Sequence, residues 1–366
     1  MAEKRSTFEA LLEDADQAPA ETTNARRARK KRHPLRNTLI VVGSLIALLA
    51  IAAGIAYAVV ASSFNEVQRV SIEQDPSLER PEAVKPAAGK NAPINILLMG
   101  SDSRETVDPD ENAAELNGFR SDAILVAQIA PDRKSMTIMS IMRDNWVEIQ
   151  GQGEAKINAA VALGGVPLAV NTVENFIGSR IDHVALIDFE SFKGLTDALG
   201  GVVVNNPLEF TAKHGGQTFQ QGKIMLDGDR ALSFVRERYA FSDGDYQRAR
   251  NQQAYLGGVM DTLLRRETLT DVNKLANTFK ALKPYLILDE GLDLTTAAKL
   301  GLDLRSIRRD DVRFFTSPTL GTGTSADGQS IVVPDTAELE NVRAAFRDGT
   351  LNEYAETRGE GSELPQ

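Results

Sequence analysis

Apolar runs alternate with short polar segments along most of the chain, and three runs near residue 100 have the length of buried β-strands. They cover residues 94–99, 122–130 and 135–142, and they are rich in Ile, Leu, Val and Met. The polar segment PDRK between the last two is a turn signal. The pattern therefore predicts that the second and third runs form an antiparallel hairpin.

Helical and strand patterns alternate over the rest of the chain, with no internal repeat. Helices are expected at residues 156–163, 166–177, 192–199, 231–234, 245–266, 272–282, 295–302 and 336–347. Strands are expected at residues 181–189, 202–204, 312–316 and 330–333. The segment from Asn205 to Leu226 is expected to be irregular or a hairpin.

One apolar stretch differs from these elements, because residues 39–60 contain no charged side chain. As a helix this stretch spans roughly 33 Å, enough to cross a bilayer once. Basic residues crowd just before it, and the positive-inside rule then places the N-terminus in the cytoplasm and the rest outside. A cleaved signal peptide ending near Ala56-Tyr57-Ala58 is the alternative, but the region before the stretch is too long for one.

The predicted organisation is a single-pass protein of the cytoplasmic membrane with one large outer domain. Its parts are a disordered basic cytoplasmic tail (1–37), a transmembrane helix (38–62), an extracytoplasmic Pro-containing linker (63–93), a globular domain (94–350) and a disordered tail (351–366).

Composition excludes several classes of protein and site. The formal charge of −10 argues against a nucleic-acid partner. The chain has no cysteine, which excludes disulfides, thiolate metal sites and a cysteine nucleophile. Three histidines are too few for a His-rich zinc site and argue against a Ser-His-Asp triad.

The predicted hairpin has a consequence for charged residues at its open end. Its arms are of similar length, so Arg143 should lie beside Arg120 and Asp122. If the first strand pairs with the second, Asp102 reaches the same edge. Neighbouring carboxylates favour a hard cation such as Mg2+, and arginines suit phosphate oxygens. The alternative interpretation is a surface cluster of salt bridges.

Two further pairs carry the same chemistry. Arg236 and Arg238 share a face if their segment is extended, and Arg248 and Gln252 share a face of the expected long helix. These four side chains suit an extended anionic substrate, or they mark a solvated basic helix start.

Several segments together resemble the LytR–CpsA–Psr family of bacterial cell-envelope proteins over most of residues 94–347. They are INILLMGSDSR, RSDAILV, SIMRDNWV, KINAAVALGG, RIDHVALIDFESFKGLTDALGGV, LDGDRALSFVRERY and GDYQRARNQQ. The resemblance implies an α/β fold in which a mixed central β-sheet is flanked by helices on both faces, with an apolar tunnel for a lipid tail. It also implies transfer of a glycopolymer from a polyprenyl-pyrophosphate carrier in the bilayer to peptidoglycan.

The resemblance assigns roles to individual positions. Asp102 and Asp122 match aspartates associated with Mg2+, a site that Mn2+ can share. The residues expected at the pyrophosphate are Arg120, Arg143, Arg236, Arg238, Arg248 and Gln252. For the transfer reaction itself we expect Asp122, or Asp102 in its place, to accept the hydroxyl proton. The residues expected to stabilise charge on the leaving phosphate are Arg120, Arg143, Arg236 and Arg238.

The chain departs from the family pattern at three positions. Met142 stands where proline is usual, Asn145 where serine is usual, and Asn251 where arginine is common.

Two other functions remain open at this point: a phosphohydrolase acting on the same lipid, and a non-catalytic envelope protein that binds polyprenyl lipids.

Overall fold

The computed structural model describes residues 67–72, 77–86, 91–101, 121–263, 286–304 and 306–358. Several predicted features lie outside these residues: the membrane helix at 38–62, Asp102, Arg120 and the helix at 272–282.

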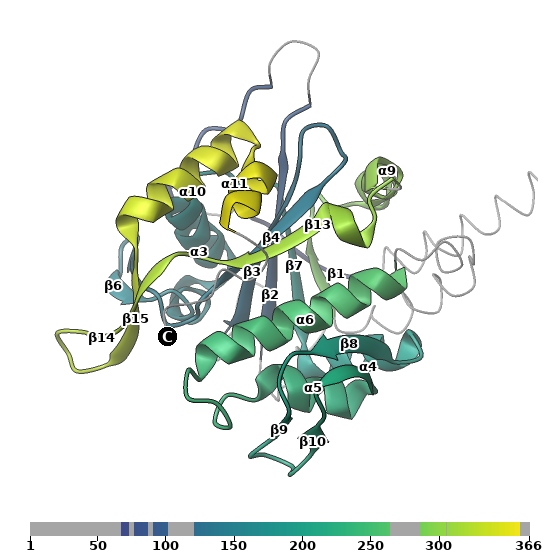
Figure 1. Ribbon diagram of the computed structural model, residues 1–366. Coiled ribbons are helices and arrows are strands. Elements are labelled where there is room, and N and C mark those ends of the chain that lie inside the picture. The colour runs from purple at the N-terminus through teal and green to yellow at the C-terminus, as the bar shows by residue number, and fades with distance from the viewer. Residues whose placement is uncertain are drawn as a thin grey trace, which may run out of the picture. The chain divides into compact units, whose positions relative to one another are not determined.

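A mixed sheet of seven strands forms the centre of the described domain (Figure 1). In spatial order its strands are β1 (Gln68–Val70), β12 (Leu286–Asp289), β7 (His183–Asp188), β2 (Ile94–Ser101), β3 (Ser121–Ile129), β4 (Met136–Ile141) and β13 (Val312–Thr316). The pairs β2–β3 and β3–β4 are antiparallel, which confirms the predicted hairpin, while β7 runs parallel to β2. The ends of β2, β4 and β7 and the start of β3 therefore share one edge.

Side chains alternate between the two faces of this sheet, and helices cover both faces, as the resemblance implied. On β3, Val126 packs with one apolar cluster, whereas Leu125 and Ala127 pack with another. The first cluster includes side chains from α3 (Ala159–Ile177), α10 (Thr336–Asp348) and α11 (Leu351–Arg358). The second includes side chains from α6 (Asp245–Leu263) and α9 (Leu294–Leu304).

A smaller module with its own core adjoins the sheet. It contains α4 (Phe189–Ala198), α5 (Gly228–Arg236), the hairpin of β8 (Val202–Asn206) with β11 (Gly222–Leu226), and the hairpin of β9 (Phe210–Thr211) with β10 (Thr218–Phe219). Phe210 is central to it, because its ring centroid lies 4.9 Å from that of Phe219 and 5.6 Å from that of Phe234. The segment from Asn205 to Leu226 thus forms ordered hairpins around an aromatic core.

The remaining elements are short. They are β5 (Trp146–Ile149) with β6 (Gly153–Lys156), β14 (Thr319–Thr324) with β15 (Ser330–Pro334), and the 3-10 helix η2 (Arg309–Asp311).

The sequence pattern predicted two helices, at residues 156–163 and 166–177, but the structure has one kinked helix, α3, in their place. Gly164 and Gly165 interrupt it with non-helical backbone, and Gly165 has a φ of 68°. Among the described residues, α3 is the one helix long and apolar enough to cross a membrane, but 72% of its most apolar window is buried inside the domain. Core packing therefore accounts for its apolar sequence.

The predicted linker (63–93) is wrong as a spacer at two places, β1 and Arg80, where the chain pairs with the domain. Strand β1 extends the sheet by pairing in parallel with β12. Further on, the Arg80 guanidinium donates to both carboxylate oxygens of Glu174, at 2.9 and 2.6 Å, and Glu174 is fully buried on α3. Backbone pairing and a buried ion pair thus hold this segment on the domain.

The expectation of a disordered tail from residue 351 is also wrong as far as Arg358. Leu351 and Ala355 on α11 are buried in the main core. The Tyr354 hydroxyl donates to Glu338 on α10 at 2.7 Å. Leu351 and Ala355 are four positions apart and so share one face of this short helix. Their packing holds the helix on the domain, although the residues around them are mostly polar or charged.

We expect Arg80→Ala to lower the free energy of unfolding by about 3 kcal/mol, because it leaves the buried Glu174 carboxylate without its counter-ion. Urea denaturation followed by the fluorescence of Trp146 measures this change. Glu356→Ala is the matched control, since its ion pair with Arg313 is exposed and should contribute less than about 1 kcal/mol. Equal effects of the two substitutions would contradict the role given to Arg80.

Candidate active site

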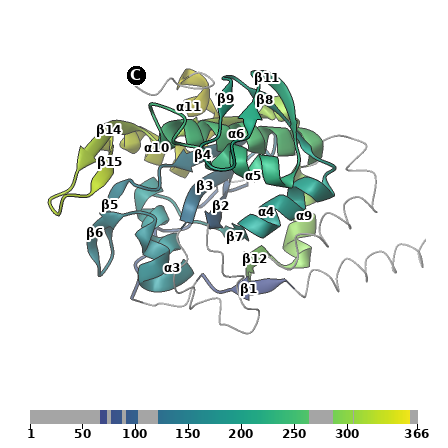
Figure 2. The same ribbon diagram turned by 90° about the horizontal axis from the view of Figure 1, so that it is seen from below.

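A pocket of about 710 Å³ opens where the central strands of the sheet end. Its floor comes from the ends of β2 and β7 and the start of β3, and its walls come from α4, α5 and α6. Figure 2 shows α4 next to the end of β7, which it follows directly in the chain. The pocket has a charged end and an apolar end.

The charged end brings together every predicted site residue that the structure describes. Its members are Asp122, Arg143, Arg236, Arg238, Arg248 and Gln252. The sequence places these residues up to 130 positions apart, yet all line one cavity. The predicted convergence is therefore confirmed for these six, and the arginines among them are called the arginine cluster below.

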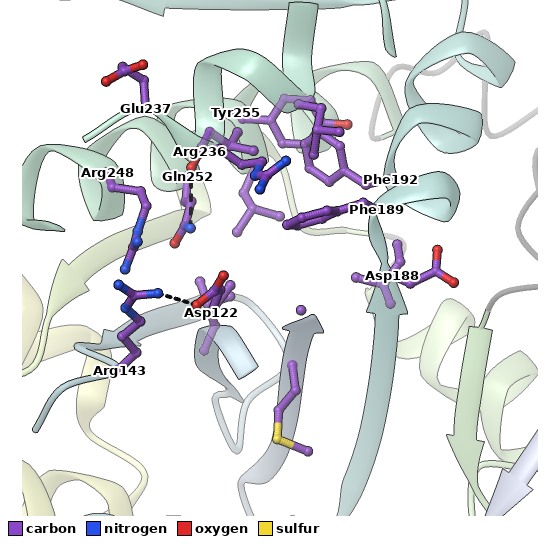
Figure 3. A pocket seen from close by; sticks show the side chains of 18 of the residues that line it. Asp122, Arg143, Asp188, Phe189, Phe192, Arg236, Glu237, Arg248, Gln252 and Tyr255 are labelled. Atoms are coloured by element: carbon purple, nitrogen blue, oxygen red, sulfur yellow. Dashed lines mark hydrogen bonds and ion pairs between the residues drawn. The ribbon is translucent and has the colours of Figure 1, made fainter. Parts of the chain in front are cut away.

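Arg143 joins the cluster to the sheet. Its guanidinium forms an ion pair with Asp122 (Figure 3). Its Nε lies 3.7 Å from Asp144. Asp144 in turn pairs with Lys156 at 3.3 Å. Burial lowers the pKa of Arg143, but attraction to Asp122 and Asp245 outweighs burial, so the pKa is raised. This arginine stays charged and fixed on the floor of the pocket.

Asp245 is the residue that sequence reasoning missed. It begins α6, and its carboxylate lies 3.4 Å from Arg143 Nε, 3.3 Å from Arg238 Nη1 and 3.1 Å from Arg248 Nη2. Burial raises its pKa, but the three guanidinium groups, Arg248 foremost, outweigh burial and hold the pKa below its usual value. One carboxylate thus orders three of the four arginines. The signal in the sequence was its position three residues before Arg248 at a helix start.

The end of α5 explains how Arg236 and Arg238 both reach the pocket. The helix stops at Arg236, and Glu237 continues with extended backbone (φ −65°, ψ 129°). Side chains two apart in an extended segment share a face, so both arginines reach the cavity, while Glu237 between them is buried. Arg236 also lies over the ring of Phe189, with Cζ 4.3 Å from the centroid (Figure 3).

Amide side chains of α6 fasten this helix to its surroundings. Asn251 is buried and donates to the Phe234 carbonyl of α5 at 3.1 Å, so the departure from the family's arginine serves packing here. Gln253 donates to Ser140 of β4 at 3.0 Å and to Thr316 of β13 at 3.1 Å. Gln252 donates to the Val235 carbonyl at 3.5 Å. Arg248 and Gln252 are therefore held at the cavity by contacts on three elements.

The apolar end lies at Phe189, Phe192 and Tyr255, apart from Asp122, Arg143 and Arg248 (Figure 3). It is lined by Leu98, Leu186, Phe192, Leu232, Tyr255 and Leu256. Burial raises the pKa of Tyr255 to about 12, and its hydroxyl lies 2.7 Å from Thr196 Oγ1. The Thr196 hydroxyl already donates to the Phe192 carbonyl at 2.8 Å, so the Tyr255 hydroxyl is the donor between them. The hydroxyl is the only polar atom of the Tyr255 side chain, and its hydrogen bond goes to Thr196, which does not line the cavity. The Tyr255 ring therefore presents an apolar surface to the cavity.

The described residues contain no group of three His, Cys, Asp or Glu side chains that could hold a metal ion by itself. They do supply one suitable oxygen donor, Asp122, at the charged end. Ser121, the residue before it, pairs with Ser101, which precedes Asp102 in the sequence. Asp102 itself lies outside the described residues, so within them this edge offers the Asp122 carboxylate beside Arg143.

Comparison with known proteins shows one family. The model of the LytR_cpsA_psr family matches residues 58–348. The polyisoprenyl-teichoic acid–peptidoglycan teichoic acid transferase TagU of Enterococcus faecalis is 33% identical over 277 residues, covering 74% of this chain and 84% of TagU. The TagU of Bacillus cereus is 36% identical over 264 residues, covering 71% of this chain and 82% of that protein.

Solved structures share the fold. The crystal structure of B. subtilis TagV aligns with a TM-score of 0.59 and 26% identity, covering 71% of this chain and 98% of TagV. A structure of TagT bound to LI-WTA aligns with a TM-score of 0.57 and 25% identity, covering 77% of this chain and 99% of TagT.

The role of Asp245 predicts a specific pH dependence. Because its pKa is lowered in the folded protein, its ion pairs stabilise the fold above the ordinary carboxyl pKa, near pH 4, and this contribution is lost as the pH falls through the lower folded value. We expect Asp245→Asn to lower the melting temperature at neutral pH and to make its decline below about pH 4 shallower.

Thermal unfolding measured from neutral to acidic pH tests this expectation. Asp243→Asn is the control, because Asp243 is half-exposed and pairs with Arg250, which does not line the pocket. Parallel pH profiles for the wild type and Asp245→Asn would show that Asp245 does not hold the arginines.

Proposed function

The chain belongs to the LytR_cpsA_psr family, and from this membership and the geometry of the pocket we propose that it is a phosphotransferase. It moves a glycopolymer from a polyprenyl-pyrophosphate carrier onto peptidoglycan. Its relatives from E. faecalis and B. cereus carry the name of a transferase that joins teichoic acid to peptidoglycan.

The observation that carries this proposal is the continuity of the two ends of the pocket. The arginine cluster offers planar donors that match the oxygens of a diphosphate. The apolar end, beginning at Phe189 and Phe192, suits the first isoprene units attached to that diphosphate. A polyprenyl pyrophosphate has this sequence of a charged head followed by an apolar chain.

Transfer requires a hydroxyl of the acceptor to attack the phosphorus that bears the sugar. A new phosphate ester forms, the bond to the bridging oxygen breaks, and polyprenyl phosphate leaves with the electron pair. Arg143, Arg238 and Arg248 stabilise the charge on the leaving phosphate. Asp122 accepts the proton of the attacking hydroxyl, held at the floor of the pocket by its ion pair with Arg143.

We further propose that Asp102 and Asp122 hold Mg2+, or Mn2+ in its place. When bound, the ion neutralises charge on the phosphate oxygens. The support is the oxygen donor of Asp122 beside the phosphate-binding arginines. Removing divalent ions with EDTA should abolish transfer, and adding Mg2+ back should restore it; full transfer in EDTA would contradict the proposal.

The proposed position of the protein follows from its substrate. We place the described domain outside the cytoplasmic membrane, tethered by the apolar stretch at residues 39–60. Both the lipid-linked donor and peptidoglycan are reached from there.

We expect Arg143→Ala and Arg238→Ala each to lower the rate of transfer roughly 10²- to 10³-fold, because each removes a preorganised donor to the developing charge. The assay uses the purified anchored protein, a lipid-linked donor and peptidoglycan. It records whether the product phosphate is bound to peptidoglycan or released free.

The matched control is Arg250→Ala, which removes an arginine from the same helix, α6, without touching the pocket. It should retain the wild-type rate. Full activity of both pocket variants would refute the assignment, and release of the phosphate in free form alone would identify a hydrolase.

A further inference from the structure

Two aromatic rings lie at the rim of the pocket and have no part in the reaction described above. Tyr239 follows Arg238 directly, lines the pocket and is 58% exposed. His214 also lines the pocket and is exposed on the turn between β9 and β10. The two ring centroids are 5.6 Å apart, with planes inclined at 54°. A large aromatic surface this open to solvent is stabilised little by the fold itself.

One buried carboxylate holds both rings in place. Glu237 is 4% exposed, and its two oxygens accept hydrogen bonds from the backbone amides of Lys213 at 2.8 Å and Ala240 at 2.9 Å. Lys213 precedes His214, and Ala240 follows Tyr239. Figure 3 shows the Glu237 side chain apart from those of Arg236 and Arg248. The two rings come from different segments of the chain, and Glu237 fixes the backbone next to each of them.

Tyr239 is also tied to the arginine cluster. Arg238 donates to the Tyr239 hydroxyl at 2.6 Å, and its Cζ lies 4.6 Å from the centre of the ring. Arg238 in turn pairs with Asp245. The ring thus stands next to the place proposed for the diphosphate, on the side open to solvent.

The order of groups in the donor indicates what meets these rings. With the apolar chain at Phe192 and Tyr255 and the diphosphate at the arginine cluster, the next group along the donor is its first sugar, which must face the open rim. The C–H face of a pyranose is apolar and its hydroxyls are polar. The apolar face of the sugar can therefore pack on an exposed aromatic ring, and the sugar hydroxyls can meet the hydroxyl of a tyrosine.

From this arrangement, and resting on the proposed function, we infer that Tyr239 and His214 form a platform for the first sugar of the donor, with Tyr239 as the main contact. They distinguish a glycosylated polyprenyl pyrophosphate from the bare lipid. Glu237 is a positioning residue for the platform.

The test compares the affinity of two probes for the purified full-length protein in detergent. One is a polyprenyl pyrophosphate of fixed chain length, and the other is the same lipid carrying one N-acetylglucosamine on the terminal phosphate. Wild type should bind the glycosylated lipid more tightly. Tyr239→Ala should weaken that lipid roughly five- to thirtyfold and the bare lipid less than twofold. Tyr239→Phe should keep most of the preference, because the ring remains.

Leu208→Ala is the control, since Leu208 is 49% exposed in the same module but does not line the pocket. It should leave both affinities unchanged. Equal weakening of both lipids by Tyr239→Ala would overturn the platform and leave Tyr239 as a support for Arg238. Equal affinity of the wild type for the two lipids would also overturn it. A wild type that binds neither lipid would instead refute the proposed function.

Discussion

Four guanidinium groups that line one small pocket repel one another, and the site depends on the carboxylates placed among them. Asp245 contacts three of the arginines and Asp122 contacts one of those three from the opposite side. Because Asp245, Arg143 and Arg248 are mostly buried, the attraction among them is screened much less than it would be on the surface. The arginines can therefore remain charged and close together without a ligand, so the proposed binding of a diphosphate would need little reorganisation.

Two parts of the fold, the central sheet and the helix α6, position these charged side chains. The antiparallel pairing of β2, β3 and β4 carries Asp122 and Arg143 to one edge of the sheet. From the other side, α6 brings Asp245 and Arg248, and Gln253 fastens this helix to β4 and β13. The smaller aromatic module then sets the end of α5, from which Arg236 and Arg238 extend into the cavity. The pocket is thus lined by both the sheet and this module, and apolar side chains from both contribute to it.

Local patterns in the sequence predicted the parts of the site that depend on local geometry. The hairpin of β3 and β4 follows from its turn signal, and the shared face of Arg236 and Arg238 follows from the extended backbone at Glu237. Asp245 was not assigned a role, because only Arg248 is related to it by helical spacing, while Arg143 and Arg238 come from distant parts of the chain. The docking of Arg80 on Glu174 and the packing of α11 were missed for the same reason, since both are long-range contacts in segments that read as charged and loose. The roles of Asp102 and Arg120 stay predictions, as both lie outside the described residues.

The most direct test of the account is an experimental structure of the protein with a polyprenyl pyrophosphate bound. The account predicts that diphosphate oxygens lie within hydrogen-bond distance of Arg143, Arg238 and Arg248, with the first isoprene units against Phe192 and Tyr255. A diphosphate bound on another surface, or bound here with its lipid chain directed toward solvent, would contradict it.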